Sequence, residues 1–209
     1  DPQILSELPP EMVDRRMYEI TKQLLAAHGY DRYEFSNYAK PGYECRHNIG
    51  YWKRVDYLGV GLGASSLIDN VRYSNTRDLY TYLSECENIH DCYMQYPLTE
   101  GVTGSAVYSA DGTHLLVPAV NLHAAAEQTT RNEQMEEFMF LGLRMMKGVS
   151  SQRFLKLFNK NINDVYAEPL EENIKNNLLC KYRDDSGVWY CLTPHGIDIS
   201  NTVMADFML

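Results

Sequence analysis

The sequence has 209 residues, of which 44% are hydrophobic and 22% are charged, a mix typical of a folded chain with one or two domains. It has no run of about 18 apolar residues and no basic segment followed by an apolar one near its start, so we expect no membrane span or signal peptide and a cytoplasmic location. The formal net charge of −9 would repel a phosphate backbone, which argues against nucleic acid as a partner.

The first half of the chain is predicted to alternate helices and strands. Residues 11–28 form an amphipathic helix, and residues 30–37 and 57–62 are predicted as strands. The apolar face of the helix is expected to consist of Val13, Met17, Ile20, Leu24 and Ala27. This alternation is typical of α/β folds, whose functional residues gather on loops that follow strands, as the loop 41–52 does.

The middle of the chain is predicted to carry a short helix and an insertion. The helix covers residues 75–83 and is capped by Ser74 or Asn75. Residues 105–117 contain two β-like runs around Ala110-Asp111-Gly112, which predicts a β-hairpin.

The last third of the chain is predicted to be mostly helical, with a second hairpin. Three helices and a β-hairpin together indicate a winged-helix-like arrangement. The expected elements are helix 130–146, helix 151–158, helix 164–179, paired strands 181–183 and 188–192, and a last helix capped by Thr193-Pro194.

Several side chains of these helices are interpreted as structural. The inner face of helix 130–146 is expected to consist of Met135, Phe138, Met139, Gly142 and Met146, which is more typical of a core than of a cofactor site. The acidic residues Asp14, Glu19, Glu136 and Glu137 are expected on solvated helix faces rather than in a paired-carboxylate site.

The densest group of polar and aromatic residues is the segment 33–52. His47 is the side chain in it most able to bind a metal or to transfer a proton near neutral pH. Asn48 could orient His47, and Tyr51 and Trp52 could flank a flat ligand. Judged on residue types alone, the favoured alternative is that His47 and Asn48 satisfy backbone groups of a loop, because a single His-Asn pair is no metal signature.

A glycine-rich segment, residues 59–66, is the second candidate site. Gly61, Gly63 and Ala64 would let a ligand approach the backbone closely. The third glycine of a dinucleotide-binding motif is missing and no helix is expected to follow, so that motif is excluded. A tight turn and a ligand contact remain equally good interpretations.

The five cysteines predict reduced thiols rather than a disulfide framework, because their number is odd and their spacing irregular. They are Cys45, Cys86, Cys92, Cys180 and Cys191. The sequence contains no C-x-x-C motif, so zinc binding by Cys86 and Cys92 with His90, His114 and His123 is only weakly indicated.

Five segments resemble the HemW/HemN family of oxygen-independent coproporphyrinogen III oxidase-like, radical-SAM proteins. The segment 33–52, with its His47-Asn48-x-x-Tyr51-Trp52 motif, resembles the central signature of HemW proteins. The other segments follow in the order of the family and span nearly the whole chain except the insertion. They are Tyr57–Ala64, Arg72-Tyr73-Ser74-Asn75, Glu136–Arg144 and Leu192-Thr193-Pro194-His195-Gly196.

The resemblance implies a fold and two ligand contacts. Residues 1–85 would be the C-terminal part of a radical-SAM partial barrel, residues 86–130 an insertion, and residues 131–209 a HemN C-terminal-like domain. His47 would be the haem ligand, with Asn48, Tyr51 and Trp52 as its motif neighbours, and Gly61, Gly63 and Ala64 would lie near S-adenosylmethionine. Ser65 stands where many relatives have His.

The family's C-x-x-x-C-x-x-C segment, which binds a 4Fe-4S cluster, is not in the sequence, so the chain is expected to be the C-terminal half of a longer protein. Its start at Asp1, without Met, suits a processed or excised piece. The leading hypothesis is a haem chaperone that delivers haem to acceptor proteins. The alternatives are a coproporphyrinogen III oxidase, which would use S-adenosylmethionine and the cluster, and a winged-helix interaction module.

Overall fold

A computed structural model describes residues 9–95, 107–108, 115–116 and 122–209. The chain forms two compact units, the first made of residues 1–54 with 131–209 and the second of residues 55–130, and each is described by itself. Within the described ranges, no helix is both long and apolar enough to cross a membrane. These two units do not test the three domains expected from the family resemblance, residues 1–85, 86–130 and 131–209, so that division stays a prediction.

The first unit begins with the expected amphipathic helix, α2, at Glu11–Ala27, and Gly29 follows it at φ +78°. None of the residues of α2 is buried, so its apolar face lies open in the described part of the chain. Two short antiparallel strands, β1 at Asp31–Arg32 and β2 at Tyr38–Ala39, come next, and α3 covers Arg46–Trp52.

The prediction of one strand over residues 30–37 is wrong, because the chain reverses direction within that range. Glu34, which is 1% exposed, accepts hydrogen bonds from the Ser36 backbone (3.1 Å) and from the Asn37 side chain. Side-chain to backbone bonds of this kind stabilise a turn in place of an extended strand. The alternation of Tyr33 and Phe35 therefore belongs to a turn.

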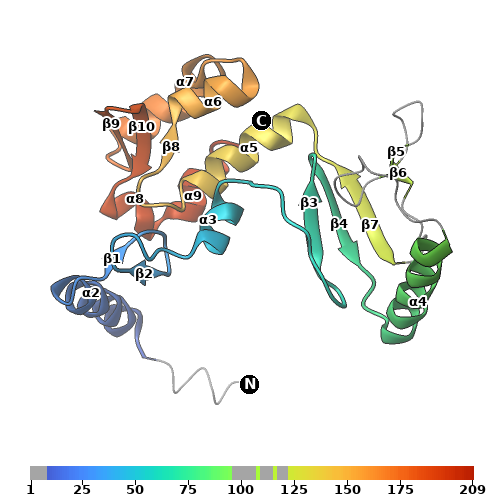
Figure 1. The fold of residues 1–209 in the computed structure, drawn as a ribbon. Coiled ribbons are helices and arrows are strands. Elements are labelled where there is room, and N and C mark those ends of the chain that lie inside the picture. The colour runs from blue at the N-terminus through green and yellow to red at the C-terminus, as the bar shows by residue number, and fades with distance from the viewer. Residues whose placement is uncertain (1–8, 96–106, 109–114, 117–121) are drawn as a thin grey trace. The chain divides into compact units, whose positions relative to one another are not determined.

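The rest of the first unit surrounds a three-stranded antiparallel sheet of order β8-β10-β9 (Figure 1). The strands are β8 Val149–Ser150, β9 Leu179–Asp184 and β10 Gly187–Leu192. The helices are α5 Arg131–Gly142, α6 Ser151–Phe158, α7 Ile162–Lys175, α8 Pro194–Asp198 and α9 Ser200–Ala205. The predicted hairpin pairing across residues 184–187 is confirmed, and β8 adds a strand that the sequence did not indicate.

The core of the first unit is aromatic and aliphatic. Phe154 is fully buried, and its ring contacts those of Phe138, Phe158 and Tyr166 with centroids 4.7–6.0 Å apart. Edge-on aromatic pairs stabilise a fold by about 0.5–1.5 kcal/mol each beyond the area that they bury. Of the predicted inner face of α5, Met135, Phe138, Met139 and Gly142 are buried.

Two predictions about α5 are wrong. The helix ends at Gly142, one turn before Met146, because the backbone N–H groups of Arg144 and Met145 bond carbonyls three residues back. Glu136 and Glu137 are buried rather than solvated, at 9% and 7% exposure. The expected cap of the last helix is confirmed, since Thr193 Oγ1 accepts a bond from Gly196 N at 3.0 Å.

The second unit contains a three-stranded antiparallel sheet of order β3-β4-β7, and Figure 1 shows these strands side by side. They are β3 Ser65–Ile68, β4 Val71–Asn75 and β7 His123–Gln128. The prediction of a strand over residues 57–62 is wrong, because only Tyr57 forms a bridge, to Leu67, and the glycines after it form a loop. The insertion supplies β7 and is therefore part of this sheet.

The other elements of the second unit are one helix and one hairpin. Helix α4 covers Leu79–Gln95, later and longer than predicted, and its start is capped by Asp78, which accepts a bond from Thr81 N at 2.8 Å. This bond also holds the pKa of Asp78 below its ordinary value. The predicted hairpin is confirmed by the pairing of β5 Val107–Tyr108 with β6 Leu115–Leu116, while Ala110-Asp111-Gly112 lies outside the described residues.

Two buried tyrosines provide a matched test of this fold. Tyr166 and Tyr190 are each 1% exposed; the Tyr190 hydroxyl donates to Asn163 Oδ1 at 2.8 Å, whereas the Tyr166 hydroxyl has no partner among the described residues. We expect Tyr190→Phe to lower the free energy of unfolding by about 0.5–1.5 kcal/mol and Tyr166→Phe to leave it unchanged or to raise it. Urea unfolding followed by tryptophan fluorescence measures both, and equal losses in the two variants would contradict the assignment.

Candidate functional site

Helix α3 carries the His-Asn-x-x-Tyr-Trp motif and presents it as two pairs of residues. His47 and Tyr51 are four residues apart and exposed, and their rings meet edge to face with centroids 4.6 Å apart. Asn48 and Trp52 form the second four-residue pair and are half-buried. Residues four apart share one face of a helix, so the motif has an outward face and an inward face.

The inward face is held by a stack of aromatic and cationic groups. The guanidinium of Arg144 lies 4.7 Å from the ring centroid of Trp52 and 5.0 Å from that of Phe35. The buried Trp52 Nε1 and Arg144 Nε have no hydrogen-bond partner among the described residues. The contacts of the Arg144 guanidinium with the two rings are therefore the interactions that join these side chains. Trp52 therefore packs against Arg144 within the first unit, and its place beside a ligand stays a prediction.

Two polar contacts after α3 fasten the helix to α5 and α6. Arg54 and Glu137 form an ion pair with side chains only 12% and 9% exposed. The Arg153 guanidinium donates to the Lys53 carbonyl at 2.5 Å and lies 5.5 Å from the Phe138 ring centroid. Burial lowers the pKa of Arg153.

A pocket of about 210 Å³ opens beside these contacts. Its wall includes Trp52, Lys53, Phe138, Lys147, Arg153 and Trp189, so three cations and three aromatic rings line one cavity of the first unit. Such a lining favours a small ligand or side chain that carries both a flat apolar part and a negative charge.

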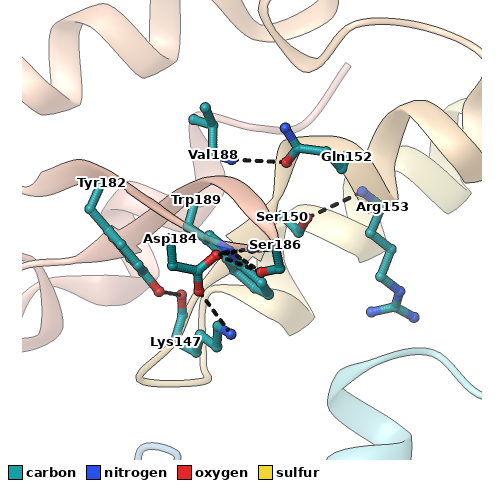
Figure 2. Close-up of polar contacts among 9 residues, drawn as sticks. All are labelled: Lys147, Ser150, Gln152, Arg153, Tyr182, Asp184, Ser186, Val188 and Trp189. Atoms are coloured by element: carbon teal, nitrogen blue, oxygen red, sulfur yellow. Dashed lines mark hydrogen bonds and ion pairs between the residues drawn. The ribbon is translucent and has the colours of Figure 1, made fainter.

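The side of this pocket next to the β9–β10 hairpin is fixed by a polar network (Figure 2). Asp184 accepts bonds from Ser186 and from Trp189 Nε1 (2.9 Å), and it pairs with Lys147 at 3.1 Å. The bond from Ser186 is the main reason why the pKa of Asp184 lies well below its usual range. The Lys147 ammonium lies 4.2 Å from the Trp189 ring centroid, so the indole is held from its edge and its face.

A second cavity, of about 450 Å³, lies in the segment that leads into α3. It is lined by Tyr30, Tyr38, Ala39, Lys40 and Tyr43, and the Lys40 ammonium lies 5.5 Å from the Tyr30 ring centroid. The buried Tyr38 hydroxyl has no partner within the described residues. This tyrosine pocket combines flat faces with one cation.

The glycine-rich loop is part of the second unit. Asn75, which is 5% exposed, donates through Nδ2 to the carbonyls of Gly61 (2.8 Å) and Gly59 (3.3 Å), and its backbone N–H donates to Ala64. Gly61 and Gly63 have positive φ values of 108° and 67°, a conformation that glycine adopts without strain. The tight-turn interpretation accounts for these contacts, and no contact in the structure tests the ligand interpretation.

The predicted site residues thus fall into two groups, with His47, Asn48, Tyr51 and Trp52 on one helix and Gly61, Gly63 and Ala64 in one loop. Sequence reasoning missed Arg54, Glu137 and Arg144 as the residues that hold α3. Arg144 is the last residue of the family segment Glu136–Arg144, and its presence there was the sequence signal that could have identified it as a contact of α3. Within the described ranges, no three His, Cys, Asp or Glu side chains form a metal-binding group. Of the residues named in the weak zinc hypothesis, His123 packs edge-on against Tyr73.

Comparison with known proteins shows which proteins the chain resembles. Residues 129–199 match the HemN C-terminal domain. The heme chaperone HemW of Lactococcus lactis is 32% identical over 98% of this chain and 45% of its own length, and that of Bacillus subtilis is 29% identical over 96% and 44%. The chain is thus similar to HemW/HemN proteins over nearly all of its length. It spans less than half the length of these relatives.

A HemN structure confirms the fold expected for the family. The chain matches coproporphyrinogen III oxidase (HemN) from Escherichia coli, described as a radical SAM enzyme, with a TM-score of 0.61 and 15% identity over 97% of this chain and 42% of that one. The described elements form a mixed α/β fold with antiparallel sheets, and none of their strands closes into a barrel. The likeness to HemN concerns the fold alone.

The buried ion pair after α3 gives a quantitative prediction for the first unit. Glu137→Leu leaves Arg54 buried without this carboxylate, so we expect the free energy of unfolding to fall by about 3–5 kcal/mol. The double variant Arg54→Met, Glu137→Leu removes both charges, and we expect it to recover most of that loss.

Urea unfolding followed by tryptophan fluorescence measures these changes. The exposed pair of Lys22 and Glu19 on α2, 3.9 Å apart, provides the control, because Glu19→Leu should change stability by less than about 1 kcal/mol. A double variant as unstable as the single one would show that the charges do not act as a pair.

Proposed function

We propose that the chain binds haem as cargo, with His47 as the iron ligand, and passes it to acceptor proteins. The carrying observation is that His47 lies exposed on a helix whose opposite face is anchored by buried contacts. Two relatives that match nearly all of this chain are named heme chaperones, and this supports the proposal.

The outward face of α3 has the properties that a transferable cargo requires. A neutral imidazole nitrogen is a good ligand for iron, and an exposed one can be reached by haem and by an acceptor protein without unfolding. The edge-on contact with Tyr51 restricts the orientation of the His47 ring. The bound iron would supply coordination chemistry, while this chain supplies a fixed imidazole at an open surface.

The tyrosine pocket supports the same proposal with a second set of groups. Its tyrosine rings offer flat surfaces to a porphyrin, and Lys40 offers a positive charge to a propionate group. Tyr38, Lys40 and Tyr43 of this pocket lie in the same segment, residues 33–52, as the motif on α3, and Tyr30 lies just before that segment.

The other functions and properties expected from the sequence have less support from the structure. Coproporphyrinogen oxidation is an activity of the HemN protein whose fold this chain shares, and no contact in the described residues favours it here. The cytoplasmic location and the lack of nucleic-acid binding stay predictions from the sequence, as does the winged-helix interaction module.

We also propose that the backbone at Gly61, Gly63 and Ala64 contacts S-adenosylmethionine. The test is equilibrium dialysis of S-adenosylmethionine against the chain and its Gly63→Ala variant, in which the new Cβ would lie 3.3 Å from Arg77 Cγ. Gly42→Ala is the control, because Gly42 also has a positive φ and its Cβ would meet open space. Equal binding by all three proteins, or by none of them, would remove this contact from the proposal.

The haem proposal predicts that His47→Ala weakens haem binding by about tenfold or more and shifts the Soret band, because the iron loses its imidazole ligand. Titration of the 209-residue chain with haem, followed by absorbance, measures both effects. His195→Ala is the matched control, since His195 is also an exposed helical histidine of the first unit and should leave affinity and spectrum unchanged.

Two outcomes would overturn the assignment. Unchanged affinity and an unchanged Soret band in His47→Ala would show that His47 does not bind the iron. Equal losses in His47→Ala and His195→Ala would show that haem binds to surface histidines without selecting α3.

A further inference from the structure

Two cysteines face each other across the β9–β10 hairpin. Cys180 and Cys191 are directly opposed in the strand register, and their sulfur atoms are 2.9 Å apart. Both are free thiols, Cys180 exposed and Cys191 half-buried. Neither takes part in the function proposed for α3.

The backbone geometry suits a covalent bond between the two sulfurs. Directly opposed residues of an antiparallel pair have Cα atoms about 4.5–5.5 Å apart, and disulfides need roughly 4.4–6.8 Å. The two strands are already paired from Leu179–Leu192 to Asp184–Gly187, so a bond between the sulfurs requires no rearrangement of the chain.

We propose that Cys180 and Cys191 form a dithiol site that low-molecular-weight disulfides such as glutathione disulfide oxidise to a cross-strand disulfide. The thiolate of Cys180 attacks one sulfur of the small disulfide, forming a mixed disulfide and releasing one thiolate. Cys191, on losing its proton to solvent, then attacks the Cys180 sulfur and expels the second small thiolate. The protein loses two electrons and two protons, and the small disulfide is reduced to two thiols.

The surroundings of the two sulfurs assign their order of reaction. Cys180 is the exposed partner and meets the small disulfide first. Burial and the bond to Cys180 raise the pKa of Cys191 to about 12, so Cys191 keeps its proton at neutral pH and acts second. The second step should therefore quicken as the pH rises.

The inference is tested on the folded 209-residue chain with excess glutathione disulfide, followed by intact mass and peptide mapping. We expect the wild-type chain to lose two hydrogen atoms at a linked Cys180–Cys191 peptide. The Cys191→Ser variant should stop at a lasting glutathione adduct on Cys180, because no second thiol lies opposite to displace it. In Cys180→Ser, the half-buried Cys191 should react more slowly than Cys180 does in the wild-type chain.

Cys45 of the same chain serves as the internal control. It is an exposed thiol, like Cys180, without an opposed partner on a strand, so it should carry a lasting glutathione adduct in every variant. A lasting adduct on Cys180 in the wild-type chain, or reaction at Cys45 with none at Cys180, would overturn the proposal. Haem binding by the chain plays no part in this readout, so the two proposals fail independently.

Discussion

The buried ion pair between Arg54 and Glu137 is the constraint on which the position of α3 depends. It joins side chains 83 positions apart in the sequence, one directly after α3 and the other in the middle of α5. Moving α3 away from α5 would separate the buried Glu137 carboxylate from the Arg54 guanidinium, and breaking a buried ion pair is strongly destabilising. The bond from Arg153 to the Lys53 carbonyl and the stack of Trp52 on Arg144 then set the rotation of the helix.

This arrangement divides the family motif into two roles. The Trp52 ring stacks on Arg144 inside the unit, and this contact gives Trp52 a structural role in the motif. His47 and Tyr51 remain outside, where they contact each other and solvent. Because the inward face of α3 is packed, the imidazole on the outward face keeps a defined direction. A histidine on a mobile loop would not. The structural half of the motif thus supports the half proposed to bind.

Sequence patterns predicted the elements that local contacts determine and failed where distant partners decide. The three- and four-residue repeat in residues 11–27 and the Thr193 cap depend on neighbours along the chain, and both are confirmed. Glu136 and Glu137 were assigned to solvent because charge on a helix usually faces water, and nothing nearby in the sequence reveals Arg54 as a partner. The prediction of a strand over residues 30–37 was wrong for a related reason. The residues alternate as in a strand, but the buried Glu34 carboxylate bonds to the Ser36 backbone and stabilises a turn.

The register of the β9–β10 hairpin explains why Cys180 and Cys191 face each other. As five positions in a sequence, the cysteines look irregular, and that irregularity argues against a disulfide framework. Once Asp184 and Gly187 close the hairpin, residues equally distant from the turn must face each other, and Cys180 and Cys191 are such a pair. The predicted turn already contained that pairing, since a hairpin is defined by its closing residues. Spacing along the chain is therefore a poor guide to thiol chemistry in a strand pair, and distance from the turn is the quantity that decides it.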